Sequence, residues 1–204
     1  MRTQPRASYH HGDLQRALVD VALELARAGG PEAVVLREAS RRLQVSPAAV
    51  YRHFPDREAL LAAVAREARS RLAARMLDEV ERVADGNAMV RAIRRFQAVG
   101  QAYLDFAADE PNLLGVAFLP VGHPGGAEED PSPWHLLAGA LDDLVATGAM
   151  PASRRPGAEL ICWSAVHGFA VLREGGAFAV SGDPQPDSSR VLDGIARALQ
   201  VWGA

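Results

Sequence analysis

The chain has 204 residues, of which 49% are hydrophobic, so it is long enough for one medium domain or two small ones with a real core. No apolar run reaches the length of a membrane span and no basic-then-apolar leader opens the chain, so we expect a cytoplasmic protein with no membrane partner. The single cysteine, Cys162, excludes an intrachain disulfide and any multi-cysteine metal site.

The formal net charge of −3 is divided unevenly along the chain. Residues 1–57 contain nine arginines and six acidic residues, whereas residues 58–204 contain thirteen and nineteen. The N-terminal quarter is therefore the basic part, as a DNA-binding domain requires. Alanine, leucine, arginine and glutamate dominate the composition, which favours helices throughout.

Residues 1–8 are polar, basic and proline-containing, and we expect them to be a disordered arm. Arg2 and Arg6 are candidates to follow a minor groove or phosphates, although an unstructured tail is the simpler interpretation. His10 and His11 resemble a metal motif, but adjacent histidines point apart in a loop and no third ligand follows nearby. We expect no metal there and no cofactor anywhere in the chain.

The first predicted helix has its apolar residues on one face, namely Leu14, Leu18, Val21 and Leu25, and Gly29-Gly30-Pro31 ends it. The next stretch, residues 35–54, is VLREASRRLQVSPAAVYRHF. Its first half predicts a short helix, with Leu36, Ala39 and Leu43 on one face and Arg37, Arg41 and Arg42 opposite.

The second half of this stretch predicts another short helix. Ser46 suits the N-cap and Pro47 the first helical position, while Phe54-Pro55 ends the element. Alanines at 48 and 49 keep the helix surface low, so its backbone can approach base edges. Two short helices joined by a tight turn are typical of a helix-turn-helix, although the alternative is an ordinary helical hairpin in a bundle.

The remaining chain predicts further helices separated by proline, glycine and polar breaks. Asp56 is expected to cap a fourth helix that runs as far as Ala84. We expect this helix to belong partly to the N-terminal three-helix domain, the head, and partly to the C-terminal domain, the body. We expect further helices over 87–109, 112–119, 133–147, 156–174 and from Ser188 or Ser189 to the C-terminus. Irregular segments are expected at 120–133 and 183–187. The expected divisions are the arm at 1–8, a DNA-binding domain at 9–57 and a ligand-binding and dimerisation domain at 58–204.

Residues 9–72 resemble the N-terminal domain of TetR-family transcriptional regulators. The resemblance depends on an alanine- and leucine-rich first helix ending in glycine, followed by VSPAAVYRHFPDREAL at residues 45–60. It implies a family-type domain at about 12–72 with its motif at 35–54. Gln44 departs from the glycine usual at the turn, and Arg57 replaces a common lysine while keeping its charge.

The C-terminal half is similar to the TetR subgroup with a Trp-His-Gly signature, here Trp163, His167 and Gly168 within WSAVHGF. The sequence YHHGDL at residues 9–14 also suits that subgroup. The resemblance implies an all-α homodimer with a three-helix head and a C-terminal bundle. In that bundle the last two long helices form a four-helix interface, and the body holds a small-molecule cavity.

The resemblance and the residue types together give candidate sites. The DNA-binding candidates are Arg37, Ser46, Pro47, Ala48, Ala49, Tyr51, Arg52, His53 and Arg57. The candidates for the cavity wall, for each of which plain core packing is the alternative, are Phe96, Tyr103, Phe106, Phe118, Trp134, Trp163 and His167. The candidates for the dimer interface are Leu192, Ile195, Leu199 and Trp202.

The expected function is a repressor that binds a palindromic operator in double-stranded DNA and is released by a small apolar or aromatic ligand. Two alternatives remain within the DNA-binding class: a regulator without an effector, and an activator. A rival from another class is an all-α enzyme using Cys162, His167 or His135. Cys162 and His167 are five residues apart on a helix and point in different directions, and no catalytic motif occurs, so we expect no enzyme.

Overall fold

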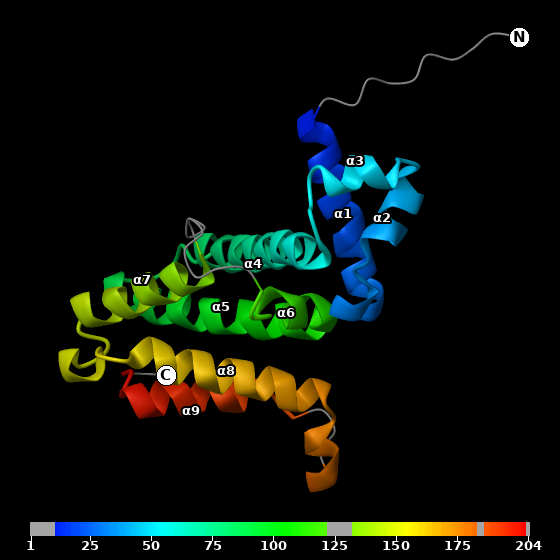
Figure 1. Cartoon of the computed structure of the whole chain (residues 1–204). Coiled ribbons are helices and arrows are strands. Elements are labelled where there is room, and N and C mark those ends of the chain that lie inside the picture. The colour runs from blue at the N-terminus through cyan, green and yellow to red at the C-terminus, as the bar shows by residue number, and fades with distance from the viewer. Residues whose placement is uncertain (1–10, 122–131, 183–185, 203–204) are drawn as a thin grey trace, which may run out of the picture. The chain divides into compact units, whose positions relative to one another are not determined.

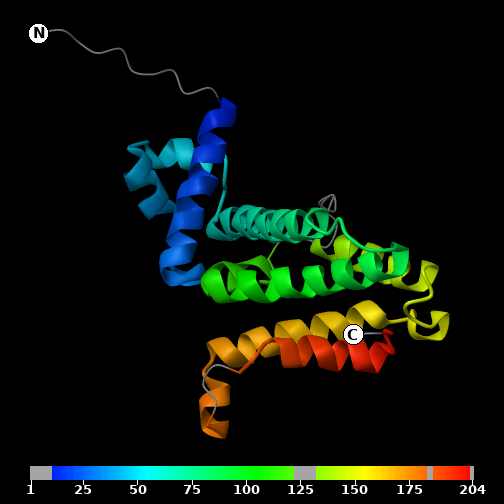
Figure 2. The same ribbon diagram turned by 180° about the vertical axis from the view of Figure 1, so that it is seen from behind.

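A computed structural model describes residues 11–121, 132–182 and 186–202. Within these ranges every regular element is a helix, which confirms the all-α prediction (Figures 1 and 2). The α-helices are α1 (His11–Gly29), α2 (Leu36–Leu43), α3 (Pro47–Tyr51), α4 (Arg57–Glu81), α5 (Ala88–Asp109), α6 (Pro111–Ala117), α7 (Pro133–Ala146), α8 (Ala158–Glu174) and α9 (Ser189–Leu199). Short 3-10 helices are η1 (Pro31–Ala33), η2 (Ala152–Arg154) and η3 (Ala177–Ser181).

Several expectations concern residues outside the described ranges. They are the arm at 1–8, His10, most of the irregular segment at 120–133 and part of the loop at 183–187. Of the helices that are described, none is long and apolar enough to cross a membrane.

The chain forms two compact units, and both are discontinuous in sequence. The head unit consists of residues 1–68 and 112–126, and the body unit of residues 69–111 and 127–204. The division therefore falls inside α4, after Ala68, where the sequence predicted a helix shared by both parts. Residues 112–117 of α6 belong to the head unit, which local sequence patterns did not indicate.

The head unit is built from α1, α2 and α3, which pack together in chain order (Figure 1). Leu18, Ala39, Val50 and Leu60 fill its core and are almost completely buried. Gly30, at φ 67°, ends α1 in a conformation that L side chains rarely adopt. Residues of α6 join the same unit, and Asn112 Nδ2 donates to the Arg27 carbonyl at 2.8 Å.

In the body unit α5 packs against α7, α8 and α9, and α8 and α9 lie side by side (Figures 1 and 2). Two of the predicted helix starts are confirmed by their caps. Asn87 Oδ1 accepts from Val90 N at 3.0 Å, and Ser132 Oγ accepts from His135 N at 3.2 Å.

Two expected boundaries are corrected by the structure. Helix α4 ends at Glu81 rather than at Ala84. Ser188 occupies the N-cap position of α9 but its side chain accepts no capping hydrogen bond, because its backbone is already helical. Asp187 supplies the carboxylate instead, since its Oδ1 accepts from Ser189 N at 2.9 Å.

Candidate functional site

The short helix α3 presents a low and accessible surface. Ser46 Oγ accepts from Ala49 N at 3.3 Å, which confirms the predicted N-cap. Val50 is buried on the inner side of the helix, with 1% of its surface exposed, and it fixes the orientation of the element. On the outer side Ala48 is exposed and Ala49 is half-buried, so other parts of the described chain leave these alanines accessible.

The turn between α2 and α3 has a non-glycine residue in a left-handed conformation. Gln44 has φ 55° and ψ 36°, which is the geometry expected if it replaces the usual glycine. The backbone N–H of Gln44 donates to the Arg41 carbonyl at 3.3 Å, and Ser40 Oγ donates to the Val45 carbonyl at 2.7 Å. These bonds hold the turn despite a conformational cost of about 1 kcal/mol.

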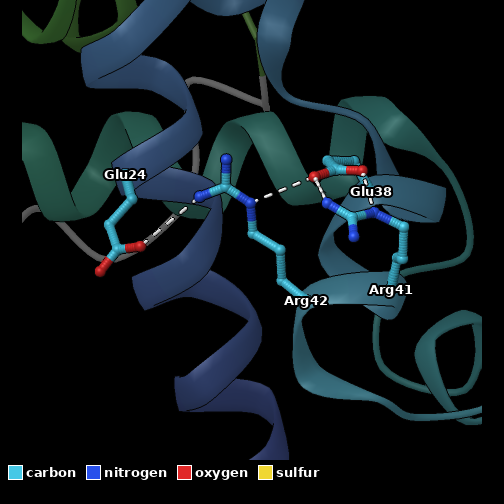
Figure 3. Close-up of polar contacts among 4 residues, drawn as sticks. All are labelled: Glu24, Glu38, Arg41 and Arg42. Carbon is cyan, nitrogen blue, oxygen red and sulfur yellow. Dashed lines mark hydrogen bonds and ion pairs between the residues drawn. The ribbon is translucent and has the colours of Figure 1, made fainter.

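The arginines of α2 differ in how much of their charge is neutralised (Figure 3). Arg41 makes two hydrogen bonds to the Glu38 carboxylate, at 2.9 and 2.7 Å. Arg42 Nε donates to the same carboxylate at 3.2 Å, and its Nη1 lies 3.6 Å from a Glu24 oxygen. These hydrogen bonds, with that of Arg41 first, lower the pKa of Glu38 from an ordinary 4.5 to about 2.

The remaining two arginines of the motif, Arg37 and Arg52, are the ones named above as DNA-binding candidates. Arg37 on α2 and Arg52 at the end of α3 are exposed, and neither has a hydrogen bond or an ion pair within the part of the chain that the structure describes. Tyr51 is 55% exposed beside them, and His53 is half-buried. The groups available for an anionic partner are therefore Arg37, Tyr51 and Arg52.

Arg57 has a structural position that the sequence did not indicate. Its Nε donates to the Val34 carbonyl at 2.9 Å and its Nη2 to the Pro31 carbonyl at 2.6 Å, and Nη2 lies 3.5 Å from Glu32. The side chain thereby satisfies backbone carbonyls around η1 from the start of α4. The expected phosphate contact of Arg57 stays a prediction, because these bonds engage Nε and Nη2 while 41% of the side chain is exposed.

The body unit contains an apolar cavity that is partly open to solvent. Three of the candidate residues line it: Phe96 and Tyr103 from α5 and Trp163 from α8. Several lining residues were not among the candidates from the sequence. They include Met76 from α4, Cys162 and Val166 from α8, and Leu192, Asp193 and Ile195 from α9.

The other four cavity candidates lie elsewhere. Trp134 is 43% exposed, with its ring centroid 5.9 Å from that of Trp163. Phe106 is buried with 4% exposed, and Phe118 belongs to the head unit. His167 does not line the cavity, but its Nδ1 lies 2.7 Å from the hydroxyl of Tyr103, which does.

The Tyr103–His167 pair is a partly buried hydrogen-bonded contact between α5 and α8. Burial raises the pKa of Tyr103 well above its ordinary range and lowers the pKa of His167. Which of the two groups donates this hydrogen bond is set by the tautomer of the imidazole. Nearby, burial raises the pKa of the Cys162 thiol to about 12, so this thiol is a poor nucleophile at neutral pH.

Exposed apolar side chains lie on α8 rather than on the expected face of α9. Ile195 and Leu199 are 5% and 1% exposed, and Leu192 lines the cavity, so the apolar stripe of α9 packs inside its own chain. Among the four interface candidates only Trp202 is well exposed. The exposed apolar residues of α8 are Leu160, Ile161, Val171 and Leu172.

A head with an accessible helix-turn-helix and a helical body with a cavity define a DNA-binding regulator. Comparison with protein families agrees: residues 18–64 match bacterial regulatory proteins of the tetR family, and residues 96–198 match the tetracyclin repressor-like C-terminal domain. The second match covers about half of the chain. The chain belongs to the TetR family of transcriptional regulators. Its place in the Trp-His-Gly subgroup stays a prediction.

Individual relatives show how far the likeness extends. An uncharacterised HTH-type transcriptional regulator of Bacillus subtilis (strain 168), YobS, is 30% identical over 110 residues, which is 54% of each chain, so the match spans about half the length of this relative. A solved protein of unknown function from Rhodococcus sp. RHA1 is 28% identical, covering 95% of this chain and 99% of its own, with a TM-score of 0.75. SmeT, solved in complex with triclosan, shares the fold at 15% identity and a TM-score of 0.54, covering 91% of this chain and 90% of its own.

Proposed function

We propose that this chain is a cytoplasmic repressor that binds a palindromic operator as a homodimer and leaves it when a small apolar or aromatic molecule enters the body. The observation that supports it most directly is the exposed, alanine-lined surface of α3 beside the unpaired guanidinium of Arg52. Small side chains let the helix backbone come close to base edges in the major groove.

On this proposal the exposed groups have different tasks on DNA. Arg37 and Tyr51 bind phosphates and set the register, since phosphate contacts carry no sequence information. Arg52 is the group able to offer a bidentate pair of donors to guanine. Because Ala48 and Ala49 provide few polar contacts, DNA shape supplies part of the specificity.

The exposed apolar residues of α8 support the proposed homodimer. Leu160 is 66% exposed and Val171 is 53% exposed, and residues eleven apart on a helix lie on nearly the same side, three turns from one another. A second copy related by a twofold axis would cover this surface. For a palindromic operator the two α3 helices of such a dimer must stand about 34 Å apart, or near a multiple of that distance.

Ligand control requires a cavity whose occupancy favours one of two states. The apolar cavity of the body unit has suitable walls, and a coupling of about 1–3 kcal/mol between ligand and DNA is typical of such regulators. A regulator without an effector would bind the same DNA but would not respond to molecules that fill this cavity.

Selection of bound duplexes from a random pool tests DNA binding, palindromy and half-site spacing together. The wild-type protein should enrich a palindrome, and Arg52→Ala should relax the preference at one position of each half-site, at a cost of about 1–3 kcal/mol. Arg94→Ala, which removes an exposed arginine of α5, is the matched control. No enrichment of any sequence at low ionic strength would contradict the proposal.

A further inference from the structure

The body cavity has one charged residue in its wall. Most of its lining is aromatic or aliphatic, with Phe96, Trp163 and Leu137 as examples, and no arginine or histidine contributes to it. The exceptions are Gln97 on α5 and Asp193 on α9. Both residues are exposed at the edge of the cavity.

The carboxylate of Asp193 is accessible to an external partner. Arg190 and Arg197 lie one turn away on α9, yet Asp193 has no ion pair or hydrogen bond within the described ranges of the chain. The other polar groups of the wall add no compensating charge. The Tyr103 hydroxyl is hydrogen-bonded to His167 Nδ1 at 2.7 Å, and burial raises the pKa of the Cys162 thiol, which keeps it protonated.

An apolar cavity with one unpaired carboxylate selects its ligand by charge. A cation gains a charge-assisted hydrogen bond at its edge, whereas an anion meets a like charge and finds no positive group in the wall. The aromatic residues of the wall also suit a cation, because the face of an aromatic ring interacts favourably with a positive group.

We propose that the ligand of this cavity is a flat aromatic molecule with one positively charged amine, its ring system against Phe96 and Trp163 and its amine at Asp193. The inference rests on the proposed function, since it names the ligand class of the same cavity. Gly100 lines the same cavity, and a Cβ there would come within 2.7 Å of Leu192 Cδ2, so that side chain would have to shift.

Three probes of similar size test the charge preference: naphthylmethylamine, naphthylmethanol and naphthoate. Binding is measured on the full chain by quenching of tryptophan fluorescence and by calorimetry. The wild type should bind the amine most tightly and naphthoate most weakly. Asp193→Asn should weaken binding of the amine about three- to tenfold and leave binding of the alcohol within about twofold. Asp143→Asn, an exposed change on α7 away from the cavity, should alter neither.

The location of binding is tested with Gly100→Ala. This change should weaken binding of the amine and of the alcohol alike, because the added methyl group reduces the space in the cavity. Thermal melting of each variant establishes that it is folded. Equal binding of amine and alcohol by the wild type, or an equal loss of both in Asp193→Asn, would overturn the charge preference while leaving a ligand-binding cavity. Binding of none of the three probes would overturn the inference and the proposed effector cavity together.

Discussion

Arg57, a residue expected to contact DNA, also holds parts of the head unit together. Its guanidinium donates to the carbonyls of Pro31 and Val34 at 2.6 and 2.9 Å, and these groups are partly buried. Replacing it removes donors from two carbonyls that have limited access to water. A loss of DNA affinity in such a variant would therefore report on the folding of the head as well as on phosphate contacts.

We expect Arg57→Ala to lower the stability of the head by about 1–3 kcal/mol, the usual cost of leaving partly buried hydrogen-bonding groups unsatisfied. Thermal unfolding followed by circular dichroism measures the change. Arg66→Ala, an exposed change on the same helix, is the control. If Arg57→Ala melts like the wild type but binds DNA weakly, the side chain acts on DNA after all.

Glu38 makes the stability of the head dependent on pH. Its folded pKa of about 2 lies below the ordinary 4.5, mainly because Arg41 and Arg42 donate hydrogen bonds to the carboxylate. The unfolded state therefore takes up a proton at higher pH than the folded state. The stabilisation is complete above about pH 4.5 and is lost as the pH falls toward 2.

Glu38→Gln should accordingly flatten the part of the stability curve between pH 4.5 and 2, because glutamine does not titrate. Urea unfolding at a series of pH values gives this curve. The effect should be small, since the carboxylate is accessible to water and salt screens it. A variant curve parallel to that of the wild type over this range would contradict the assignment.

At the scale of the element, the turn after α2 carries an avoidable conformational cost. Gln44 has φ 55°, a region that glycine adopts without the steric penalty of a Cβ atom. Gln44→Gly should stabilise the head, by somewhat less than about 1 kcal/mol because glycine also gives the unfolded chain more freedom. A melting curve of the purified variant measures this, and a decrease in melting temperature would contradict it.

Helix starts were predictable because their signals are local. Ser46-Pro47, Ser132-Pro133 and Asn87 each place a capping side chain within three residues of the amide that it accepts from. The pairing of Glu38 with Arg41 and Arg42 is a local signal of the same kind, because spacings of three and four residues bring side chains together on one face of a helix.

The direction in which α8 and α9 face was not predictable from either helix alone. Both have apolar stripes, and periodicity does not say whether a stripe meets its own chain or a second copy. Long-range packing buries Leu199, with 1% of its surface exposed, and leaves Leu172 with 49% of its surface exposed. The contact of Tyr103 with His167, 64 residues away, is likewise a product of tertiary packing rather than of local sequence.

At the scale of the whole molecule, the exposed residues of α8 predict which changes dissociate a dimer. Ile161→Glu should give folded monomers, because Ile161 is 47% exposed and a charge there opposes burial against a second copy. Light scattering coupled to size-exclusion chromatography measures the mass. Met89→Glu, at an exposed apolar residue of α5, should leave the assembly unchanged. A dimer that survives Ile161→Glu would move the interface to another surface.

The discontinuous course of the chain limits how this protein can be divided or recombined. The chain leaves the head unit after Ala68 and re-enters it at Asn112, bringing Leu113 and Val116, both fully buried. A fragment that stops at residue 68 would lack these side chains and expose the apolar residues that they cover. Transplanting the DNA specificity of this regulator onto another body is therefore better done by exchanging the surface of α3 than by joining whole segments end to end.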